Sequence, residues 1–228
     1  MGTVQGDVFF TGGANAPSTK SRRSPHGPLA NGPGLMTATG TPYAVRDAAS
    51  YWEPVWRQGR RYRGIDAAEA GAMHRHLGAG RGRPALDIGC GDGALTAHLA
   101  RLGYHSTGID CAPTAVAAAR ARHPQLDLRV LDFDSADTDS LPRSAYAVVA
   151  CRLVYRWAAD KPGFLSRVRR ILAPGGVFWV VTSLHTEGQG PPRPWEATAA
   201  DVELLTAQWS RVRVVELDPS FRCYALRP

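Results

Sequence analysis

Lysine is nearly absent from this sequence: of its 27 basic residues, only Lys20 and Lys161 are lysines, and the rest are arginines. The formal net charge is +7, a sign that often accompanies binding to nucleic acid. Arginine beside abundant alanine and glycine is also what a GC-rich genome encodes. We therefore attribute the charge to codon bias and expect no nucleic-acid partner.

Long apolar runs are missing as well. No window approaches the roughly 18 apolar residues that a membrane span needs, and the first residues lack the basic-then-apolar order of a secretory signal. Gly6 stands where an N-myristoylation pattern needs serine or threonine. We expect no membrane partner, and the sequence alone leaves open whether translation starts at Met1 or at Met36.

Cysteine is scarce and scattered. The four cysteines are Cys90, Cys111, Cys151 and Cys223. No C-x-x-C pair suggests a zinc site, and the spacing does not suggest a disulfide framework. We expect no metal, and we expect reduced thiols in a cytoplasmic protein.

The chain divides by composition into a tail and one domain. Residues 1–42 are rich in Gly, Pro, Ser and Asn without an apolar period, which is typical of disorder. The remaining residues, 43–228, are enough to bury one sizeable core. We predict a disordered N-terminal tail followed by a single domain.

Strands and helices are expected to alternate along this domain. The apolar segments expected to be strands are 85–90, 106–110, 126–131, 146–151, 177–182, 211–217 and 221–226. The expected helices are 67–77, 94–102, 113–122, 164–172 and 200–208, and residues 48–63 are expected to begin as a helix and become a loop after Gly59. Such alternation predicts an α/β fold: a Rossmann-like, seven-strand, mostly parallel sheet with helices on both faces. The last two strands have no helix between them, so they predict a C-terminal β-hairpin.

A glycine-rich loop, Asp87-Ile-Gly89-Cys-Gly91-Asp-Gly93, joins the first strand to the next helix. Glycines let the backbone approach a ligand, and a helix N-terminus favours negative charge. Gly89-x-Gly91-x-x-Ala94 also satisfies the dinucleotide fingerprint, so the loop alone leaves the cofactor open.

Acidic residues end the neighbouring strands. Asp110 ends the second strand, where a carboxylate can accept both ribose hydroxyls, and Asp132-Phe133 follows the third. There a carboxylate can receive the adenine amino group while the ring stacks. Together with Asp87, these acids predict a nucleoside site at the switch point of the sheet.

In these motifs the chain resembles the class I S-adenosylmethionine (SAM)-dependent methyltransferase family, over residues 43–227. Asp87-x-Gly89-x-Gly91-x-Gly93 is similar to the family's first motif, Asp110 to its ribose-binding acid, and Asp132-Phe133 to its adenine-binding position. The resemblance implies SAM as the cofactor. The expected cofactor-binding residues are Asp87, Gly89, Cys90, Gly91, Gly93, Asp110, Cys111, Asp132, Phe133, Cys151, Trp56 and Tyr62.

Residues 43–66 are expected to form a lid over the cofactor. The pattern Trp52-x-x-x-Trp56-x-x-Gly59-x-x-Tyr62 resembles the lid of thiopurine-type methyltransferases. An aromatic face stabilises a sulfonium cation. The alternative is that Trp52 and Trp56, four residues apart, simply pack a helix on the sheet.

The segment after the fourth strand is expected to face the methyl acceptor. Arg152, Tyr155 and Arg156 are predicted to bind substrate, and two arginines indicate an anionic acceptor. The alternative is that an arginine there caps a helix or pairs on the surface. Tyr155 and His185 are the candidate catalytic residues, although a lone loop histidine is more often incidental.

The same segment excludes several specialised methyltransferases. Cys151-Arg152-Leu153-Val154-Tyr155 lacks the [DN]-P-P-[YF] motif of DNA and protein-amide enzymes. We therefore expect a small-molecule O-, N- or S-methyltransferase of secondary metabolism. The alternatives are an NAD-dependent oxidoreductase, which the absence of a Tyr-x-x-x-Lys motif disfavours, and a non-catalytic SAM-binding protein.

Overall fold

The fold was analysed in a computed structural model that describes residues 48–59, 62–186, 188, 190–193 and 195–228. The tail predicted to be disordered, residues 1–42, lies outside the described residues, as does the start of the expected lid. The division into tail and domain therefore remains a prediction. No helix in the described part is long and apolar enough to cross a membrane.

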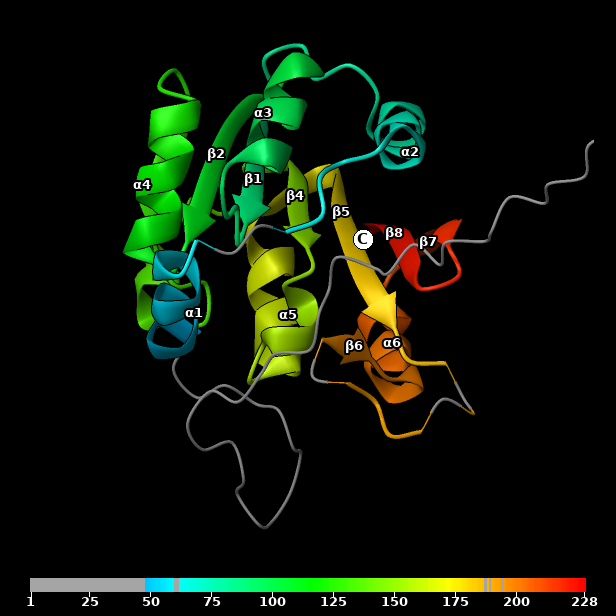
Figure 1. The fold of residues 1–228 in the computed structure, drawn as a ribbon. Helices are drawn as coiled ribbons and strands as arrows, with labels where there is room; N and C mark the ends of the chain where they lie inside the picture. Colours follow the sequence, from blue (N-terminus) through cyan, green and yellow to red (C-terminus); the bar gives the residue numbers. More distant parts are fainter. Residues whose placement is uncertain (1–47, 60–61, 187, 189, 194) are drawn as a thin grey trace, which may run out of the picture. The chain divides into compact units, whose positions relative to one another are not determined.

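The chain forms one mixed sheet in the order β3-β2-β1-β4-β5-β8-β7, with the short β6 paired to β5 (Figure 1). Strands β1 to β5 pair in parallel, whereas β8 runs antiparallel to both β5 and β7. The strands are β1 Pro84–Ile88, β2 His105–Asp110, β3 Asp127–Val130, β4 Tyr146–Arg152, β5 Leu172–Leu184, β6 Glu196–Ala197, β7 Arg211–Asp218 and β8 Phe221–Arg227. This arrangement confirms the predicted seven-strand sheet and its terminal hairpin. The two-residue β6 is an addition that the sequence did not predict.

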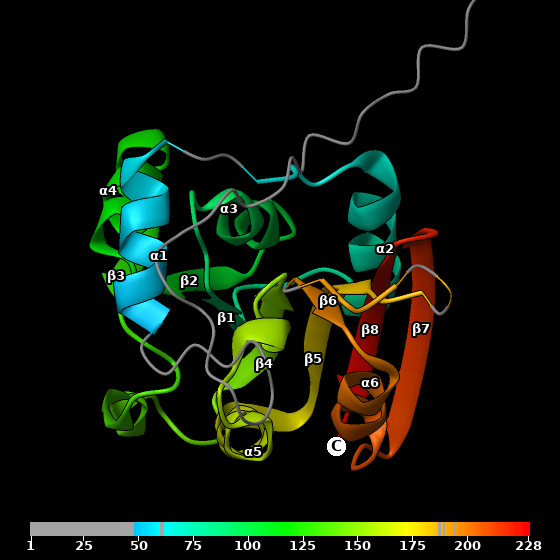
Figure 2. The same cartoon turned by 60° about the horizontal axis from the view of Figure 1, so that its bottom comes forward.

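The predicted helices are all present, including α1 at the start of the segment 48–63. The helices are α1 Ala48–Arg57, α2 Ala67–Leu77, α3 Ala94–Arg101, α4 Pro113–Arg122, α5 Lys161–Ile171 and α6 Ala199–Thr206, with 3₁₀ turns η1 Ala136–Ser140 and η2 Tyr155–Trp157. Local chemistry fixes their starts: Asp66 caps α2 by accepting from Glu69 N at 2.9 Å, and Thr198 forms a capping box with Asp201. Figure 2 shows α2 and α3 on one side of the sheet and α5 and α6 on the other.

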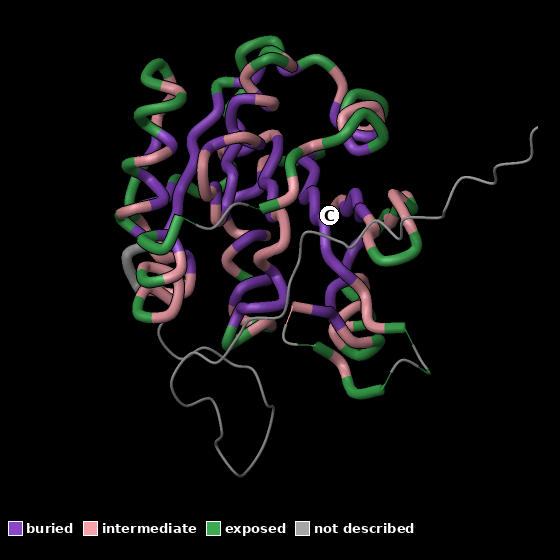
Figure 3. Tube along the Cα trace, viewed as in Figure 1, coloured by how far each residue is buried: buried purple, intermediate pink, exposed green. Residues whose placement is uncertain are grey.

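The core has two layers because alternate residues of a strand point to opposite faces of the sheet. In β5, Trp179 and Val181 join Met73 and other residues of α2 and α3. Phe178 and Val180 join the opposite cluster with α5 and α6. The central strands are buried along most of their length (Figure 3), so they form a rigid base for the loops at their carboxyl ends.

The start of β5 differs from the prediction. A helix over 164–172 and a strand beginning at Val177 were expected, but β5 already begins at Leu172. Tyr146 pairs with Leu172 and Val148 with Val177, so the extra residues form an irregularity in the ladder. Gly175, with φ of +70°, provides the left-handed backbone that this irregularity needs.

Candidate functional site

A pocket of about 350 Å³ lies at the carboxyl ends of β1, β2 and β4. Its walls come from the glycine loop, the ends of these strands, the residues after β3, and α1 with the segment that follows it. Among the predicted site residues, those that line it are Trp56, Tyr62, Asp87, Gly89, Cys90, Gly91, Asp110, Cys111, Asp132, Phe133 and Arg152. The structure therefore brings together most of the cofactor site that the sequence predicts.

The glycine loop needs glycine for steric reasons at two positions. Gly89 and Gly91 both have positive φ, at +68° and +53°. A Cβ on Gly89 would lie 2.3 Å from Cγ2 of Val154, and one on Gly91 would lie 2.9 Å from Cζ2 of Trp56. The backbone of the loop therefore lies close to Val154 and Trp56 of the pocket lining. A side chain at Gly89 or Gly91 would prevent this close approach.

Asp87 holds a buried acceptor that has no hydrogen-bond donor within the described residues. Its Oδ2 accepts from the hydroxyl of Thr96 at 2.7 Å, whereas its Oδ1 has no partner. Burial raises the pKa of this carboxyl to about 7. An unsatisfied buried acceptor is costly, so its place in the wall of a pocket suits a ligand that brings a donor, such as an ammonium group.

Asp110 ties the glycine loop to the start of α4. Its Oδ2 accepts from Gly91 N and its Oδ1 from Ala112 N, each at 2.9 Å. Burial raises the pKa of Asp110, and the two backbone hydrogen bonds oppose that rise. The carboxylate expected at the ribose therefore also shapes the loop beside it.

Asp132 and Phe133 form the next part of the wall. Oδ1 of Asp132 accepts from Asp134 N at 3.0 Å, which turns the chain after β3. The ring of Phe133 packs edge-on against Phe164, with centroids 4.9 Å apart, and the guanidinium of Arg167 lies 5.7 Å from its centroid. This packing holds the ring in place, and a planar ligand can lie beside it without further ordering.

Three aromatic residues in α1 and the segment after it, Trp52, Trp56 and Tyr62, form what we call the aromatic lid. Tyr62 lies 5.9 Å from Trp52 and 5.6 Å from Trp56 between ring centroids. Trp157 of η2 completes the group at 5.0 Å from Trp52. Trp56 also packs on Ala112 and Ala115 at the start of α4 rather than on the sheet, and a lid over the cofactor stays a prediction.

Trp157 is a pocket residue that the sequence analysis did not select. The signal was an aromatic residue in the segment after the fourth strand, but no periodicity there indicates which way a side chain points. Further pocket residues that were not predicted are Leu131, Asp134, Leu153, Val154 and Phe164.

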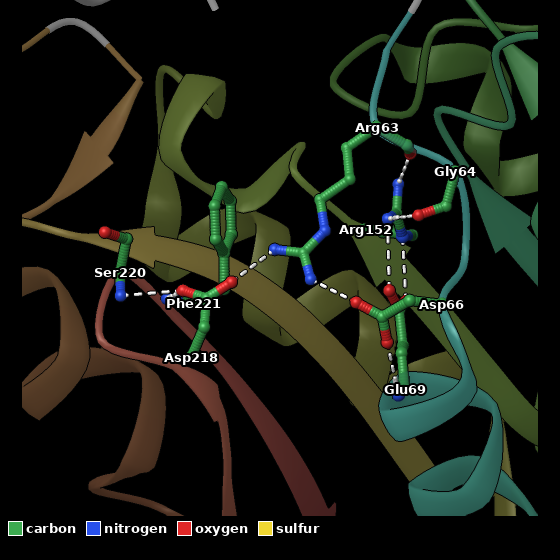
Figure 4. A network of polar contacts seen from close by, with 8 residues as sticks. All are labelled: Arg63, Gly64, Asp66, Glu69, Arg152, Asp218, Ser220 and Phe221. Carbon is green, nitrogen blue, oxygen red and sulfur yellow. Dashed lines mark hydrogen bonds and ion pairs between the residues drawn. The ribbon is translucent and has the colours of Figure 1, made fainter. Parts of the chain in front are cut away.

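Arg152 lines the pocket, but its guanidinium is used by the protein itself (Figure 4). Nε and Nη2 donate to the two carboxylate oxygens of Glu69 at 2.7 and 3.0 Å. Nη1 and Nη2 also donate to the carbonyls of Arg63 and Gly64, at 2.8 and 3.1 Å. Four of its five N–H groups are thereby engaged. The placement does not support the prediction that Arg152 binds an anionic acceptor.

Arg63 fastens the same segment to the C-terminal hairpin. Its Nη1 donates to Oδ2 of Asp218 at 2.7 Å, its Nη2 donates to Asp66, and its guanidinium lies 4.6 Å from the ring centroid of Phe221. Figure 4 shows this arginine reaching between the hairpin turn and the start of α2. The segment that bears Tyr62 is thus held from two sides.

The predicted substrate and catalytic residues after β4 and β5 lie outside the pocket lining. The hydroxyl of Tyr155 donates to the carbonyl of Asp201 at 3.1 Å, and burial raises its pKa. Arg156 is buried; its Nε donates to the carbonyl of Glu196 at 2.6 Å and lies 3.8 Å from Oδ2 of Asp201. His185 Nδ1 lies 3.4 Å from Oε2 of Glu196. These contacts link η2, β6 and α6 to one another, and the substrate and catalytic roles expected for the three residues stay predictions.

Two predicted cofactor residues are also displaced from the wall. Cys151 is fully buried in the core under α5, and burial raises the pKa of its thiol. Gly93 occupies the N-cap of α3 with φ of +80°. Cys151 and Gly93 therefore contribute indirectly, because they belong to β4 and to the start of α3, which position the residues that line the pocket.

Comparison with known proteins agrees with this geometry. Residues 86–180 match the family described as "Methyltransferase domain". A curated relative from Paramagnetospirillum magneticum, "Ubiquinone biosynthesis O-methyltransferase", is 32% identical over 61% of this chain and 60% of its own length. A namesake from Methylobacterium nodulans is 32% identical over 49% of the chain and 48% of its own length. The chain thus spans about three fifths or less of these relatives.

Solved structures share the fold at low sequence identity. A SAM-dependent methyltransferase from Aquifex aeolicus covers 77% of this chain and 98% of its own, with a TM-score of 0.61 and 18% identity. The "DhpI-SAM-HEP complex" covers 83% and 100%, with a TM-score of 0.62 and 21% identity. Together with the methyltransferase-domain match over residues 86–180, these structures support a class I SAM-dependent methyltransferase fold for this chain.

Proposed function

We propose that this protein transfers a methyl group from SAM to an oxygen, nitrogen or sulfur atom of a small molecule. One observation carries the proposal: the pocket combines a buried acceptor that lacks a donor among the described residues, Oδ1 of Asp87, with an aromatic lid. The first suits the ammonium of SAM, and the second suits its sulfonium.

The residues of the pocket fit the parts of SAM in order. Asp87 suits its ammonium, Asp110 its ribose, and Asp132 with Phe133 its adenine. Bound SAM supplies an electrophilic methyl group. The chain's own task is to hold the acceptor in line with that group and to exclude water, which the aromatic lid is placed to do.

We further propose that the acceptor carries no net negative charge. Each arginine among the described pocket residues is already in an ion pair. The pairs are Arg63 with Asp66 and Asp218, Arg122 with Asp92, and Arg152 with Glu69. An anionic acceptor would therefore have to compete with the protein's own carboxylates. This replaces the anionic acceptor expected from the sequence.

The setting of the reaction is part of the proposal. We place the reaction in secondary metabolism. A structural neighbour with a TM-score of 0.59 and 18% identity is described by the words "Conversion of a Disulfide Bond into a Thioacetal Group during Echinomycin Biosynthesis". We place it in the cytoplasm, which is consistent with four free cysteines.

Methyl transfer from SAM labelled in its methyl group tests the proposal. The purified protein is incubated with a panel of neutral phenols, amines and thiols, each matched to a carboxylated analogue. Label in a neutral or cationic acceptor supports the proposal, and label only in the carboxylated analogues contradicts the acceptor class. SAM binding without any transfer favours the non-catalytic alternative.

A further inference from the structure

Helix α1 carries both tryptophans of the aromatic lid and is fastened to the start of α4 by one side chain. Glu53, between Trp52 and Trp56, reaches Thr114 in the first turn of α4. Its Oε2 accepts from Thr114 N at 3.0 Å, and its Oε1 accepts from the Thr114 hydroxyl at 2.6 Å. Figures 1 and 2 both show α1 beside α4.

This contact supplies a cap that α4 lacks from its own sequence. Ala112 occupies the N-cap and has no side-chain acceptor, and Pro113 in the first turn has no N–H. A carboxylate that accepts an amide at a helix N-terminus is stabilised by the helix dipole. The hydrogen bond from the Thr114 hydroxyl is the largest cause that lowers the pKa of Glu53. The capping group of α4 is therefore a charged residue of the lid helix.

The same helix start is shared with the cofactor site. Asp110 accepts from Ala112 N, two residues before Thr114. Trp56, three residues after Glu53, packs on Ala112 and lies against Gly91. Residues three apart lie on neighbouring positions of a helix surface. A movement of α1 as a unit away from the glycine loop would therefore take Glu53 off Thr114 together with Trp56 off Gly91.

We propose that Glu53 is a positioning residue, a latch that keeps the aromatic lid closed over the pocket, and that its release from Thr114 governs how fast a bound ligand leaves. The proposal rests on the proposed function only in naming SAM as that ligand. The latch itself is a property of the chain without ligand.

Trypsin cleavage after Arg57, followed by mass spectrometry without ligand, tests the latch. Glu53→Ala is expected to raise the cleavage rate about tenfold, because the loss of a charged hydrogen bond is worth about a factor of ten or more. Thr114→Val is expected to raise it by a smaller factor. This second variant keeps the ion pair of Glu53 with Arg57, at 2.9 Å, so its effect cannot come from freeing the cleavage site itself.

Glu203→Ala is the matched control, because Glu203 is exposed on α6, away from the lid helix. It is expected to be cleaved at the wild-type rate. The melting temperatures of all variants should stay within about three degrees of the wild-type value. Trp56 is the one described residue of α1 that is buried, so loosening this helix exposes little of the core. Wild-type cleavage rates in both Glu53→Ala and Thr114→Val overturn the latch.

The dissociation rate of SAM, measured by stopped-flow tryptophan fluorescence, tests the gating. Glu53→Ala is expected to raise it about tenfold while the association rate changes less. Faster cleavage with an unchanged dissociation rate overturns the gating role. If the wild-type protein does not bind SAM, the proposed function fails, and proteolysis still decides whether the latch exists.

Discussion

The guanidinium of Arg152 and the carboxylate of Glu69 form a bidentate ion pair that joins the end of β4 to α2, with N–O distances of 2.7 and 3.0 Å. The Glu69 side chain is fully buried, and that of Arg152 is 12% exposed. In the sequence the two residues are 83 positions apart. The pair accounts for an arginine in the pocket lining whose charge is already neutralised by the protein.

Substituting one partner of this pair should destabilise the fold. Arg152→Met leaves Glu69 buried without a counter-ion, which costs about 3–5 kcal/mol. Urea unfolding measures the loss, and the double variant Arg152→Met with Glu69→Met should recover part of it. If Arg152 instead bound the acceptor, Arg152→Met would leave unfolding unchanged and raise only the acceptor KM.

Asp110→Ala should weaken SAM binding more than Asp132→Ala does. Asp110 holds the amides of both Gly91 and Ala112 and is positioned for the ribose, whereas Asp132 accepts one backbone amide, that of Asp134. Losing charge-assisted bonds costs about 1.5–3 kcal/mol each, so Asp110→Ala should reduce affinity by more than tenfold. Calorimetry of the two matched variants checks the order. Equal affinity in wild type and Asp110→Ala would contradict the ribose assignment.

Asp87 should make the stability of the ligand-free protein depend on pH. Burial raises the pKa of this carboxyl from its ordinary value to about 7. The native state thus binds the proton more tightly than the unfolded chain does. The free energy of unfolding should therefore fall as pH rises from about 4 to about 7, and level off above that.

Asp87→Asn removes the titrating group and isolates this effect. Between pH 5 and pH 8 the variant should gain about 2–3 kcal/mol of stability relative to wild type, at about 1.4 kcal/mol per pKa unit. Urea unfolding at the two pH values measures the difference. A difference between the two proteins that stays constant with pH would mean that the carboxyl is not buried as described.

Gly91→Ala should impair SAM binding because the added methyl group displaces Trp56. The new methyl group would lie 2.9 Å from Trp56, in a backbone with φ of +53°. Gly175→Ala is the matched control, since its φ is +70° but nothing lies within 4 Å of the added Cβ. Both variants should lose about 1–2 kcal/mol of stability from backbone strain. Only Gly91→Ala should lower the affinity for SAM, as measured by calorimetry. Equal losses of SAM affinity in the two variants would contradict the steric role of Trp56.

Features encoded locally could be predicted from the sequence. The strands and helices follow from apolar segments and their caps, such as Asp66 before α2. Asp87, Asp110 and Asp132 could be placed together because the carboxyl ends of parallel strands meet at one edge of a sheet. The pocket residues at these strand ends follow from the same rule.

Partners that come from distant parts of the chain could not be predicted. Arg152 and Arg156 stand where an acceptor was expected, but their partners Glu69 and Glu196 lie 83 and 40 residues away. No sequence period shows that an arginine already has a hydrogen-bond partner. The direction of Trp157 likewise depends on the η2 turn, which no motif indicates.

The most direct test of the account is calorimetric titration of the purified protein with SAM and, separately, with NAD. SAM should bind with a stoichiometry near one, and Asp110→Ala should bind it more weakly. NAD should give no heat of binding. Tight binding of NAD together with no heat from SAM would contradict the account and favour the oxidoreductase alternative.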